Sequence, residues 1–206
     1  HRDLKPANIM VGEHGEVLVL DWGLAKLVGE RDEPVGQSDA RSPGPFVTRE
    51  GSIAGTPAFM SPEQAGGKVD QINARSDVYA LGGILYNILA GRSPYRGRDS
   101  VEVIQMVIDG PPKPVTEALG PAARDHVSTL EALVRICETA MSRDPRERFP
   151  DARSVVEEVT AWLDGSLRRA QALSIVEEAK ELVPEAALML EHADLLRLEA
   201  ENELEY

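Results

Sequence analysis

The sequence predicts a mainly α-helical domain with one short β-hairpin near its N-terminal end. Three observations lead to this fold class. Two short apolar runs, 9–11 and 17–20, are separated by the turn composition Gly-Glu-His-Gly. Residues 73–90 have apolar side chains around most of a helix's circumference, which predicts a buried central helix. After Gly165 the composition becomes rich in Ala, Leu and Glu, which predicts further helix.

The N-terminal segment is predicted to be a loop followed by the hairpin. Residues 1–8 are too polar for a core element, and Pro6 argues against a helix there. The second hairpin strand leads directly into residues 21–23, Asp-Trp-Gly. Residues 29–52 have no apolar period and are rich in Gly, Pro, Ser and charged side chains. We expect them to form a long mobile loop.

The helical part of the domain begins at Ser61. The stretch 61–64, Ser-Pro-Glu-Gln, is typical of a helix start, because it places Pro in the first turn and an acid near the positive end of the helix dipole. In the central helix five apolar residues share one face at helical spacing, and this face is expected to lie in the core. They are Val78, Leu81, Leu85, Ile88 and Leu89, and the face is widened by Ala80, Ile84 and Tyr86.

Three more helices are expected to complete the body of the domain. Asp99 is a candidate N-cap for a helix over 100–108, which Gly110-Pro111-Pro112 would end. Further helices are predicted at about 127–142 and 151–163, the second with Asp151 as its N-cap. We therefore predict a domain over residues 1–163.

Residues 164–206 are predicted to form a separate acidic helical extension. Two amphipathic stretches, about 167–182 and 185–205, flank Pro184, which favours a helical hairpin or one kinked long helix. A single tetratricopeptide-like unit is an alternative, but only one copy is seen. The extension has 11 acids against 4 bases, so it holds more than half of the net charge of −13. A helical arm that binds a protein partner is one interpretation.

The composition excludes several classes of protein. With 42% hydrophobic and 28% charged residues the chain is typical of a soluble globular domain. The negative charge repels phosphate backbones, so we expect no nucleic-acid partner. No run of 18 apolar residues is present to span a membrane. The single cysteine, Cys137, favours a reducing compartment, and we expect a cytoplasmic domain whose parent protein could still be tethered to a membrane.

The first eight residues read His1-Arg2-Asp3-Leu4-Lys5-Pro6-Ala7-Asn8. This octet resembles the catalytic loop of protein kinases, and the resemblance implies phosphoryl transfer from ATP. The residue types suit that chemistry. The carboxylate of Asp3 can accept or orient a hydroxyl proton, and Lys5 can place a cation near a migrating phosphoryl group. Asn8 offers an amide oxygen to Mg²⁺, a hard ion that prefers oxygen ligands.

The same family resemblance extends along the chain to residue 163. Asp21-Trp22-Gly23 is similar to the family's Asp-Phe-Gly metal motif, which implies that Asp21 bridges Mg²⁺ and the ATP phosphates and that Gly23 permits the backbone turn. Residues 55–63, Gly-Thr-Pro-Ala-Phe-Met-Ser-Pro-Glu, resemble the end of the activation segment. By resemblance, Thr56 contacts the catalytic Asp3 and Lys5. The implied cofactors are ATP and Mg²⁺, bound by Lys5, Asn8 and Asp21.

Further residues are implied to support the site rather than to take part in the chemistry. Glu63 is expected to pair with Arg148, since one acid and one Arg in apolar surroundings suit a buried bidentate bridge. Asp77, on an apolar helix, needs hydrogen-bond partners. The resemblance supplies them in the backbone around His1 and Arg2.

Arg2 before the catalytic Asp implies control by phosphorylation, because a phosphate can organise a loop around an Arg. The segment from Asp21 to Glu63 offers Ser38, Ser42, Thr48 and Ser52, and we expect Thr48 or Ser52 to be the regulatory site. Each hydroxyl could equally be a solvated loop residue.

Substrate class and organism type follow from the resemblance. Lys5 and Thr56 are the serine/threonine forms of their positions, so the implied substrates are Ser or Thr residues of proteins. Residues 21–26, Asp-Trp-Gly-Leu-Ala-Lys, together with Glu63-Gln64, look most like bacterial kinases of the eukaryotic (Hanks) type. The resemblance covers the C-terminal lobe only. No glycine-rich phosphate loop or strand lysine is seen, so we expect the N-terminal lobe of the same protein as a missing partner and the chain alone to be inactive.

Two alternatives differ in class from this leading hypothesis. A pseudokinase or non-catalytic scaffold is disfavoured because the acids, the lysine and the amide of the site are all retained. A small-molecule phosphotransferase of similar fold is disfavoured by residues 55–63, since such an enzyme needs no peptide platform.

Overall fold

A computed structural model describes residues 1–26, 57–119 and 127–204. The chain divides into two compact units, His1–Val159 and Thr160–Tyr206. The predicted loop over 29–52 lies outside the described residues.

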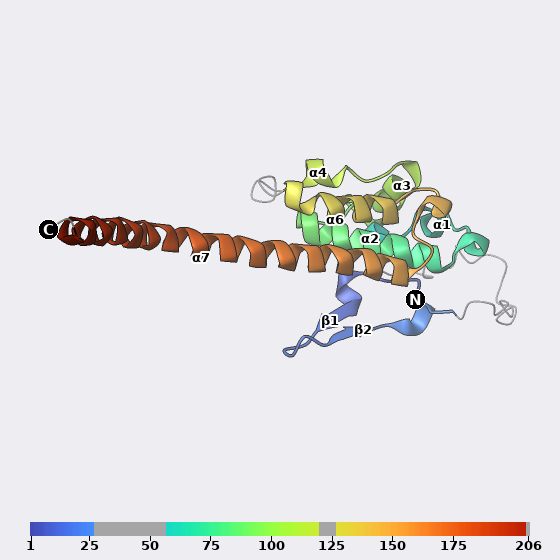
Figure 1. The fold of residues 1–206 in the computed structure, drawn as a ribbon. Helices are drawn as coiled ribbons and strands as arrows, with labels where there is room; N and C mark the ends of the chain where they lie inside the picture. The colour runs from blue at the N-terminus through green and yellow to red at the C-terminus, as the bar shows by residue number, and fades with distance from the viewer. Residues whose placement is uncertain (27–56, 120–126, 205–206) are drawn as a thin grey trace, which may run out of the picture. The chain divides into compact units, whose positions relative to one another are not determined.

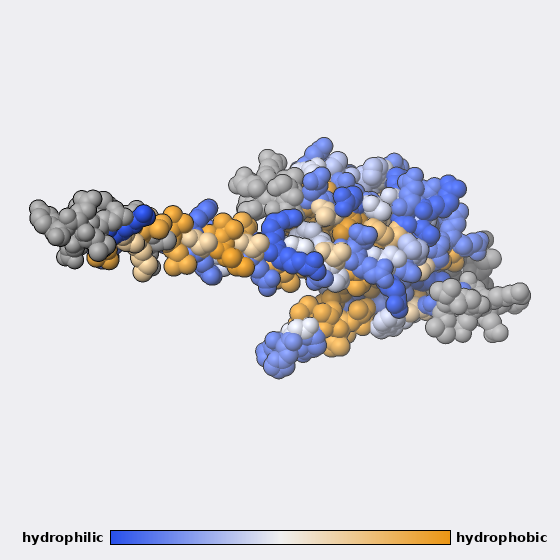
Figure 2. Space-filling model, in the orientation of Figure 1, coloured by the Kyte–Doolittle hydropathy of each residue, from blue (hydrophilic) through white to orange (hydrophobic). Residues whose placement is uncertain are grey.

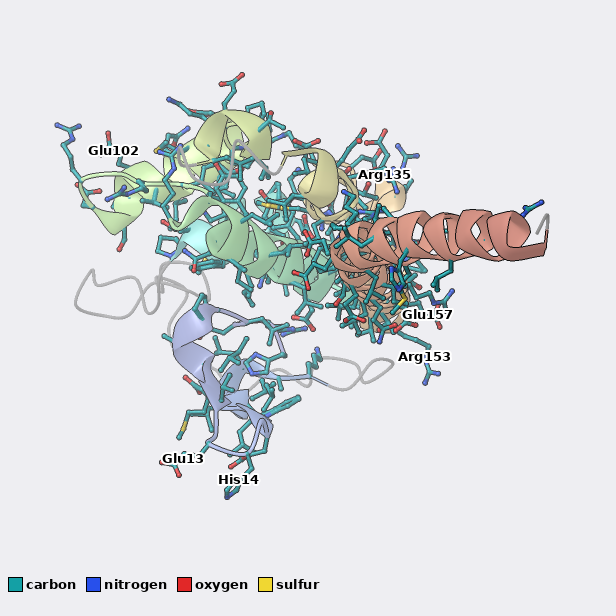
Figure 3. All side chains as sticks on the ribbon, turned by 60° about the vertical axis from the view of Figure 1, so that its left-hand side comes forward. Glu13, His14, Glu102, Arg135, Arg153 and Glu157 are labelled. Carbon is teal, nitrogen blue, oxygen red and sulfur yellow. The ribbon has the colours of Figure 1, made fainter. Side chains whose placement is uncertain are left out.

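The predicted hairpin is confirmed. Strands β1 (Ile9–Val11) and β2 (Val17–Val19) pair antiparallel as a two-stranded sheet. Gly15 adopts φ 83° in the connecting turn, a left-handed conformation that glycine reaches without a steric cost. Glu13 and His14 lie at the tip of the hairpin, away from the helices (Figure 3). The hairpin stands beside the helical body rather than inside it (Figure 1).

Helix α2 (Ala74–Ala90) lies at the centre of the first unit, as predicted. Its N-cap is Asn73, whose side chain accepts a hydrogen bond from the Arg75 backbone at 2.9 Å. Helices α6 (Val127–Ala140) and α4 (Val115–Ala118) pack against it. Helix α4 has only four residues, too few to produce the apolar period by which the longer helices are recognised.

The predicted core face of α2 is wrong in part. Val78 is fully buried, but Ile88 is 71% exposed and Leu85 is only partly buried. The most deeply buried large residues are Tyr86, which was predicted to widen this face, and Tyr79, which was not part of the prediction.

Two glycines explain this different choice of face. A Cβ atom at Gly82 would lie 2.8 Å from the Cβ of Ala140, and one at Gly83 would lie 3.2 Å from the Phe59 ring. The absence of side chains at these positions lets α6 and the Pro57–Phe59 turn come close to the α2 backbone. The small residues of α2, and not only its aliphatic ones, therefore define its contact surface.

Two further helices of the first unit begin where the sequence indicates. Helix α3 (Ser100–Asp109) is capped by Asp99, whose carboxylate accepts from the Glu102 backbone at 2.9 Å. Helix α1 (Pro62–Ala65) follows Ser61, with Pro in its first turn. The first confirms the predicted N-cap at Asp99, and the second confirms the predicted helix start at residues 61–64.

Helix α7 (Ala152–Leu204) is continuous from the first unit into the second. Asp151 caps it by accepting a hydrogen bond from the Ser154 backbone at 2.9 Å, as predicted. Helix α7 runs through Gly165 and Pro184 without interruption, so the predicted helix end at residue 163 is wrong. The helical hairpin and the tetratricopeptide-like unit are wrong as well, because both need a turn between two helices, and the alternative of one long helix is the one that forms. One glycine costs a helix about 1 kcal/mol and one proline about 3 kcal/mol, which the strong helix formers around them offset. No helix within the described ranges has the length and apolar character needed to cross a membrane.

The buried apolar residues of the first unit form two clusters. The first joins α2, α4 and α6 and includes the buried thiol of Cys137. Burial raises the pKa of this thiol to about 12. The second joins the Pro57–Phe59 turn to α3 through Ala58, Phe59, Tyr95, Val103 and Val107.

The close approach at Gly82 predicts a stability effect. Gly82→Ala should lower the free energy of unfolding by up to about 2 kcal/mol, because overpacking costs about 1–3 kcal/mol while the gain in helix propensity returns only about 1 kcal/mol. Gly110→Ala is the matched control, since a Cβ there meets nothing within 4 Å and its φ of −163° is extended. Urea unfolding would measure both. Equal stability of the two variants would contradict the packing argument.

Candidate active site

The side chains of Asp3, Lys5 and Asn8 meet at one point of the N-terminal loop. Lys5 Nζ donates to Asp3 Oδ2 at 2.7 Å. Asn8 Nδ2 donates to the Asp3 backbone oxygen at 2.8 Å and to Asp3 Oδ2 at 3.1 Å. A short 3-10 turn over Pro6–Asn8, with Pro in its first position, folds the amide back onto the acid. A carboxylate, an ammonium and an amide therefore occupy a single polar cluster.

The backbone of Arg2 is held on both sides by residues far along the chain. Its nitrogen donates to Asp77 Oδ1 at 2.9 Å, and its oxygen accepts from Gln64 Nε2 at 2.7 Å. The backbone nitrogen of His1 donates to the other oxygen of Asp77, also at 2.9 Å. Arg2 adopts φ 71°, a left-handed conformation that costs a non-glycine residue about 1–3 kcal/mol. These hydrogen bonds hold the strained loop in place.

The side chain of His1 connects the loop to the segment after β2. Its Nε2 lies 3.0 Å from the backbone oxygen of Leu20. Its ring lies against the ring of Trp22, with centroids 4.8 Å apart and planes tilted by 58°. The indole nitrogen of Trp22 donates to the Val19 backbone at 2.8 Å, although the side chain is 61% exposed.

The hairpin register brings Asp21 next to the polar cluster. The Leu20 backbone nitrogen donates to the Asn8 backbone oxygen at 2.8 Å, so Asp21 follows directly after a residue bonded to Asn8. The left-handed backbone of this motif lies at Asp21, with φ 61°. Gly23 supplies space instead, since a Cβ there would lie 3.3 Å from Asp21 Oδ1.

The donor set suits Mg²⁺ that arrives with a nucleotide. Both hydrogen bonds of the Asn8 side chain use its nitrogen, which leaves the amide oxygen as an acceptor. Asp21 adds a carboxylate. Across the described residues there is no cluster of three His, Cys, Asp or Glu that could hold a metal by itself. Mg²⁺ ordinarily binds one or two protein oxygens and completes its shell with phosphates and water, so this sparse set fits.

A buried ion pair lies behind the site. Arg148 donates two parallel hydrogen bonds to Glu63, Nη1 to Oε1 at 2.8 Å and Nη2 to Oε2 at 2.9 Å. The two residues are 3% and 4% exposed, and Ser76 adds a third hydrogen bond to Glu63 at 2.7 Å. Burial raises the pKa of Glu63, but the hydrogen bonds from Arg148 and Ser76, together with the Arg148 charge, more than offset this and hold it below its ordinary value.

Several supporting contacts could not be expected from the sequence motifs. Arg148 lies over the Tyr79 ring at 4.9 Å and also donates to the Ser142 backbone at 2.7 Å. Arg75 binds the backbone oxygens of Pro145 and Arg148 at 2.8 Å each. Both arginines donate to backbone carbonyl oxygens of a loop, and a sequence pattern cannot predict which carbonyls such a side chain reaches. Gln64 does have a sequence signal, because Ser-x-x-Gln is a capping-box pattern.

Some of the expected site residues lie outside the described residues. They are the substrate-platform residue Thr56 and the loop hydroxyls Ser38, Ser42, Thr48 and Ser52. Their roles stay predictions.

An acid, a lysine and an amide in one cluster, with a second acid after a hairpin, form an arrangement that is typical of protein kinases. Comparison with known families agrees, since residues 1–160 match the protein kinase domain family. The chain belongs to the protein kinase family.

The relatives are serine/threonine kinases of bacteria. Serine/threonine-protein kinase pkn3 of Myxococcus xanthus is 36% identical over 173 residues, which are 82% of this chain and 28% of the relative. PknB of Mycobacterium tuberculosis is 32% identical over 187 residues, 91% of this chain and 26% of the relative. PknD of Protochlamydia amoebophila is 32% identical over 170 residues, which are 80% of this chain and 16% of the relative. The predicted bacterial Hanks-type family is thereby confirmed. The chain spans less than a third of each of these relatives.

The buried bridge predicts a large stability effect. Arg148→Gln should lower the free energy of unfolding by roughly 3–5 kcal/mol, because it leaves the Glu63 carboxylate buried without its partner. The matched control is Arg98→Gln, which removes the ion pair between Glu102 and an Arg98 side chain that is 90% exposed. This change should lower the free energy of unfolding by less than about 1 kcal/mol. Denaturant unfolding of the two variants gives the comparison. A similar loss in both would show that burial of the bridge is unimportant.

Proposed function

We propose that this chain provides the catalytic loop and metal-binding acid of a protein kinase that transfers the γ-phosphoryl group of ATP to Ser or Thr of proteins. The observation that supports this most directly is the cluster in which Lys5 and Asn8 both bond to Asp3. Such transfer needs little covalent chemistry from the protein. It needs a hydroxyl and a phosphate held in line within a positive field.

The roles follow from the contacts. Asp3 accepts the hydroxyl proton of the substrate and points it toward the phosphate. Lys5, held 2.7 Å from Asp3, offers its charge to the transferring group. Asn8 and Asp21 hold Mg²⁺, which neutralises charge on the phosphates when bound. Trp22, in the place of the family's Phe, keeps an aromatic packing partner for His1.

We also propose that the apolar surface of the hairpin packs against the N-terminal lobe of the same protein. Met10, Val11, Val17 and Leu18 are 53–70% exposed, and apolar side chains gather along the hairpin in Figure 2. Residues 1–206 include no glycine-rich phosphate loop, so this chain alone is proposed to be inactive. In the same proposal, residues 1–163 act as the kinase lobe and 164–206 as an extension. The kinase portion would work in the cytoplasm, where ATP is available.

A phosphorylation assay tests the catalytic proposal. In the full-length natural protein, Asp3→Asn should lower kcat by about 10²–10⁴-fold, because the base is lost while its hydrogen-bonding shape is kept. Asp21→Asn should raise the Mg²⁺ concentration needed for half-maximal rate. The control is Glu157→Gln on the exposed side of α7 (Figure 3), which should leave the rate unchanged.

Three results would each contradict a part of this proposal. A folded Asp3→Asn protein with the wild-type rate would remove Asp3 from the chemistry. A folded full-length wild-type protein without any transfer would favour the alternative of a non-catalytic scaffold. Phosphorylation by residues 1–206 alone would refute the dependence on an N-terminal lobe.

We propose that phosphorylation of Thr48 or Ser52 regulates the kinase through Arg2, with Thr56 contacting Asp3 and Lys5. The support is the position of Arg2 beside the catalytic acid, since a phosphate can pair with an Arg and organise the loop that bears it. Phosphopeptide mapping after incubation of the full-length protein with ATP should find phosphate at Thr48 or Ser52. Phosphate confined to sites outside 38–52 would count against this.

A further inference from the structure

The second unit contains a seven-residue repeat that phosphoryl transfer does not explain. Alanine recurs at every seventh position, at Ala172, Ala179, Ala186, Ala193 and Ala200. Three residues after four of these alanines stands a large aliphatic residue, namely Ile175, Leu182, Met189 and Leu196. A further aliphatic residue often follows directly, as in Val176, Val183 and Leu190. In coiled-coil notation the alanines are a positions, and the aliphatic residues are d and e positions.

The period of this repeat points to another helix as the partner. A straight α-helix has 3.6 residues per turn, so a stripe that follows its own period drifts by about 20° per heptad from a strict seven-residue repeat. A stripe that keeps the seven-residue repeat over four heptads stays aligned with a neighbouring helix only if the two supercoil. A globular partner would not require this repeat.

The stripe is uncovered in the chain by itself. The seven d and e side chains named above are 47–68% exposed. Apolar side chains follow one another along α7 in Figure 2. Burying a large aliphatic side chain completely stabilises by about 1.5–3 kcal/mol, which at about 25 cal/mol per Å² corresponds to roughly 60–120 Å² of apolar surface removed from water. Fourteen such side chains from two copies, each about three-fifths exposed, would therefore bury roughly 500–1,000 Å² before the alanines and the flanks are counted, which approaches the size of a specific interface.

We propose that residues 172–200 pair with the same residues of a second copy of this chain as a parallel, two-stranded coiled coil. A second copy has the same seven-residue period over the same length, so no other partner has to be assumed. The line of a, d and e positions along which the two helices would meet is called the seam. Alanine at the a positions lets the two helices come close, while the d residues fill the layers between them. This inference does not depend on phosphoryl transfer.

The charge pattern favours the parallel arrangement. The g positions, from residue 171 at intervals of seven, read Gln, Glu, Glu, His and Glu. In an antiparallel pair g positions face each other, so glutamates would oppose glutamates. In a parallel pair each g position faces an e position, where the sequence provides Val176, Val183 and Leu190. The parallel alignment therefore avoids the like-charge contacts.

Pro184 fits this arrangement, because it occupies an f position on the side of the helix opposite the seam. Its ring removes one backbone hydrogen bond, and that defect faces away from the partner. Helix α7 is continuous through Pro184.

A measurement of mass in solution tests the proposal. The 206-residue chain should elute from size exclusion with light scattering at twice 22.4 kDa at tens of micromolar. The double variant Leu182→Glu and Met189→Glu at the d positions should be monomeric, with dimerisation weakened at least tenfold. The matched control is Leu173→Glu and Leu188→Glu, which are 59% and 66% exposed at b and c positions and should leave the dimer intact. Circular dichroism verifies that all three proteins keep their helix content.

Each other outcome overturns part of the inference. A wild-type monomer at 100 µM would show that no second copy covers the stripe. A dimer that survives the d substitutions, or that the b and c substitutions disrupt equally, would show that the seam lies elsewhere. A mass above two chains would exclude the two-stranded arrangement.

The orientation has its own test. Ala193→Cys places a thiol at an a position, where a parallel, in-register pair brings two copies of residue 193 together. Mild oxidation should then give a covalent dimer on a non-reducing gel, while the wild type, whose Cys137 is buried, should give none. Failure of Ala193→Cys to cross-link while the protein remains dimeric would exclude the parallel alignment.

Discussion

The left-handed backbone of Arg2 is the constraint on which the site depends. The conformation is unfavourable for a residue with a side chain, and it directs the chain so that Asp3 meets Lys5 and Asn8. It persists because both ends of the residue are bonded, to Asp77 through the nitrogen and to Gln64 through the oxygen. Strain at the reactive loop is therefore offset by hydrogen bonds from two helices.

Those two helices are in turn fixed by the Glu63–Arg148 bridge. Glu63 neighbours Gln64 on α1, and Ser76, one residue before Asp77 on α2, bonds to the same carboxylate. One buried anion thus connects both residues that hold Arg2. A buried pair contributes less net stability than an apolar packing of equal size would, but it specifies geometry, because each charge has one acceptable partner. Positioning, rather than gross stability, is the role that this bridge can fulfil in the site.

The sequence predicted those elements whose signals are local. The hairpin, the caps at Asp99 and Asp151 and the central helix all follow from neighbouring residues. The sequence prediction failed where a contact between distant segments determines the structure. The core face of α2 depends on how closely other segments approach Gly82 and Gly83. Local signals also left two alternatives open at Pro184, a hairpin and one long helix, of which the structure shows the long helix.

For the site, motif and spacing suggested each group, but the strained residue and the two bonds that hold it could not be foreseen. A φ angle of 71° at an arginine has no signature in composition or period. The link from Gln64 to Arg2 joins positions 62 residues apart. The capping-box pattern that includes Gln64 indicates where a helix begins, but it does not indicate that the amide nitrogen of Gln64 bonds to another segment.

The two units of the chain illustrate different sources of helical stability. Helix α2 is held by burial, with tyrosines and a valine at 0–2% exposure. Beyond Thr160, by contrast, none of the described side chains of α7 is buried. Helices obtain most of their stability from packing an apolar face, and propensity alone makes a long helix marginal in water. A helix with an uncovered apolar stripe is therefore incomplete as a single chain, and a partner that covers the stripe would stabilise the helix and the association together.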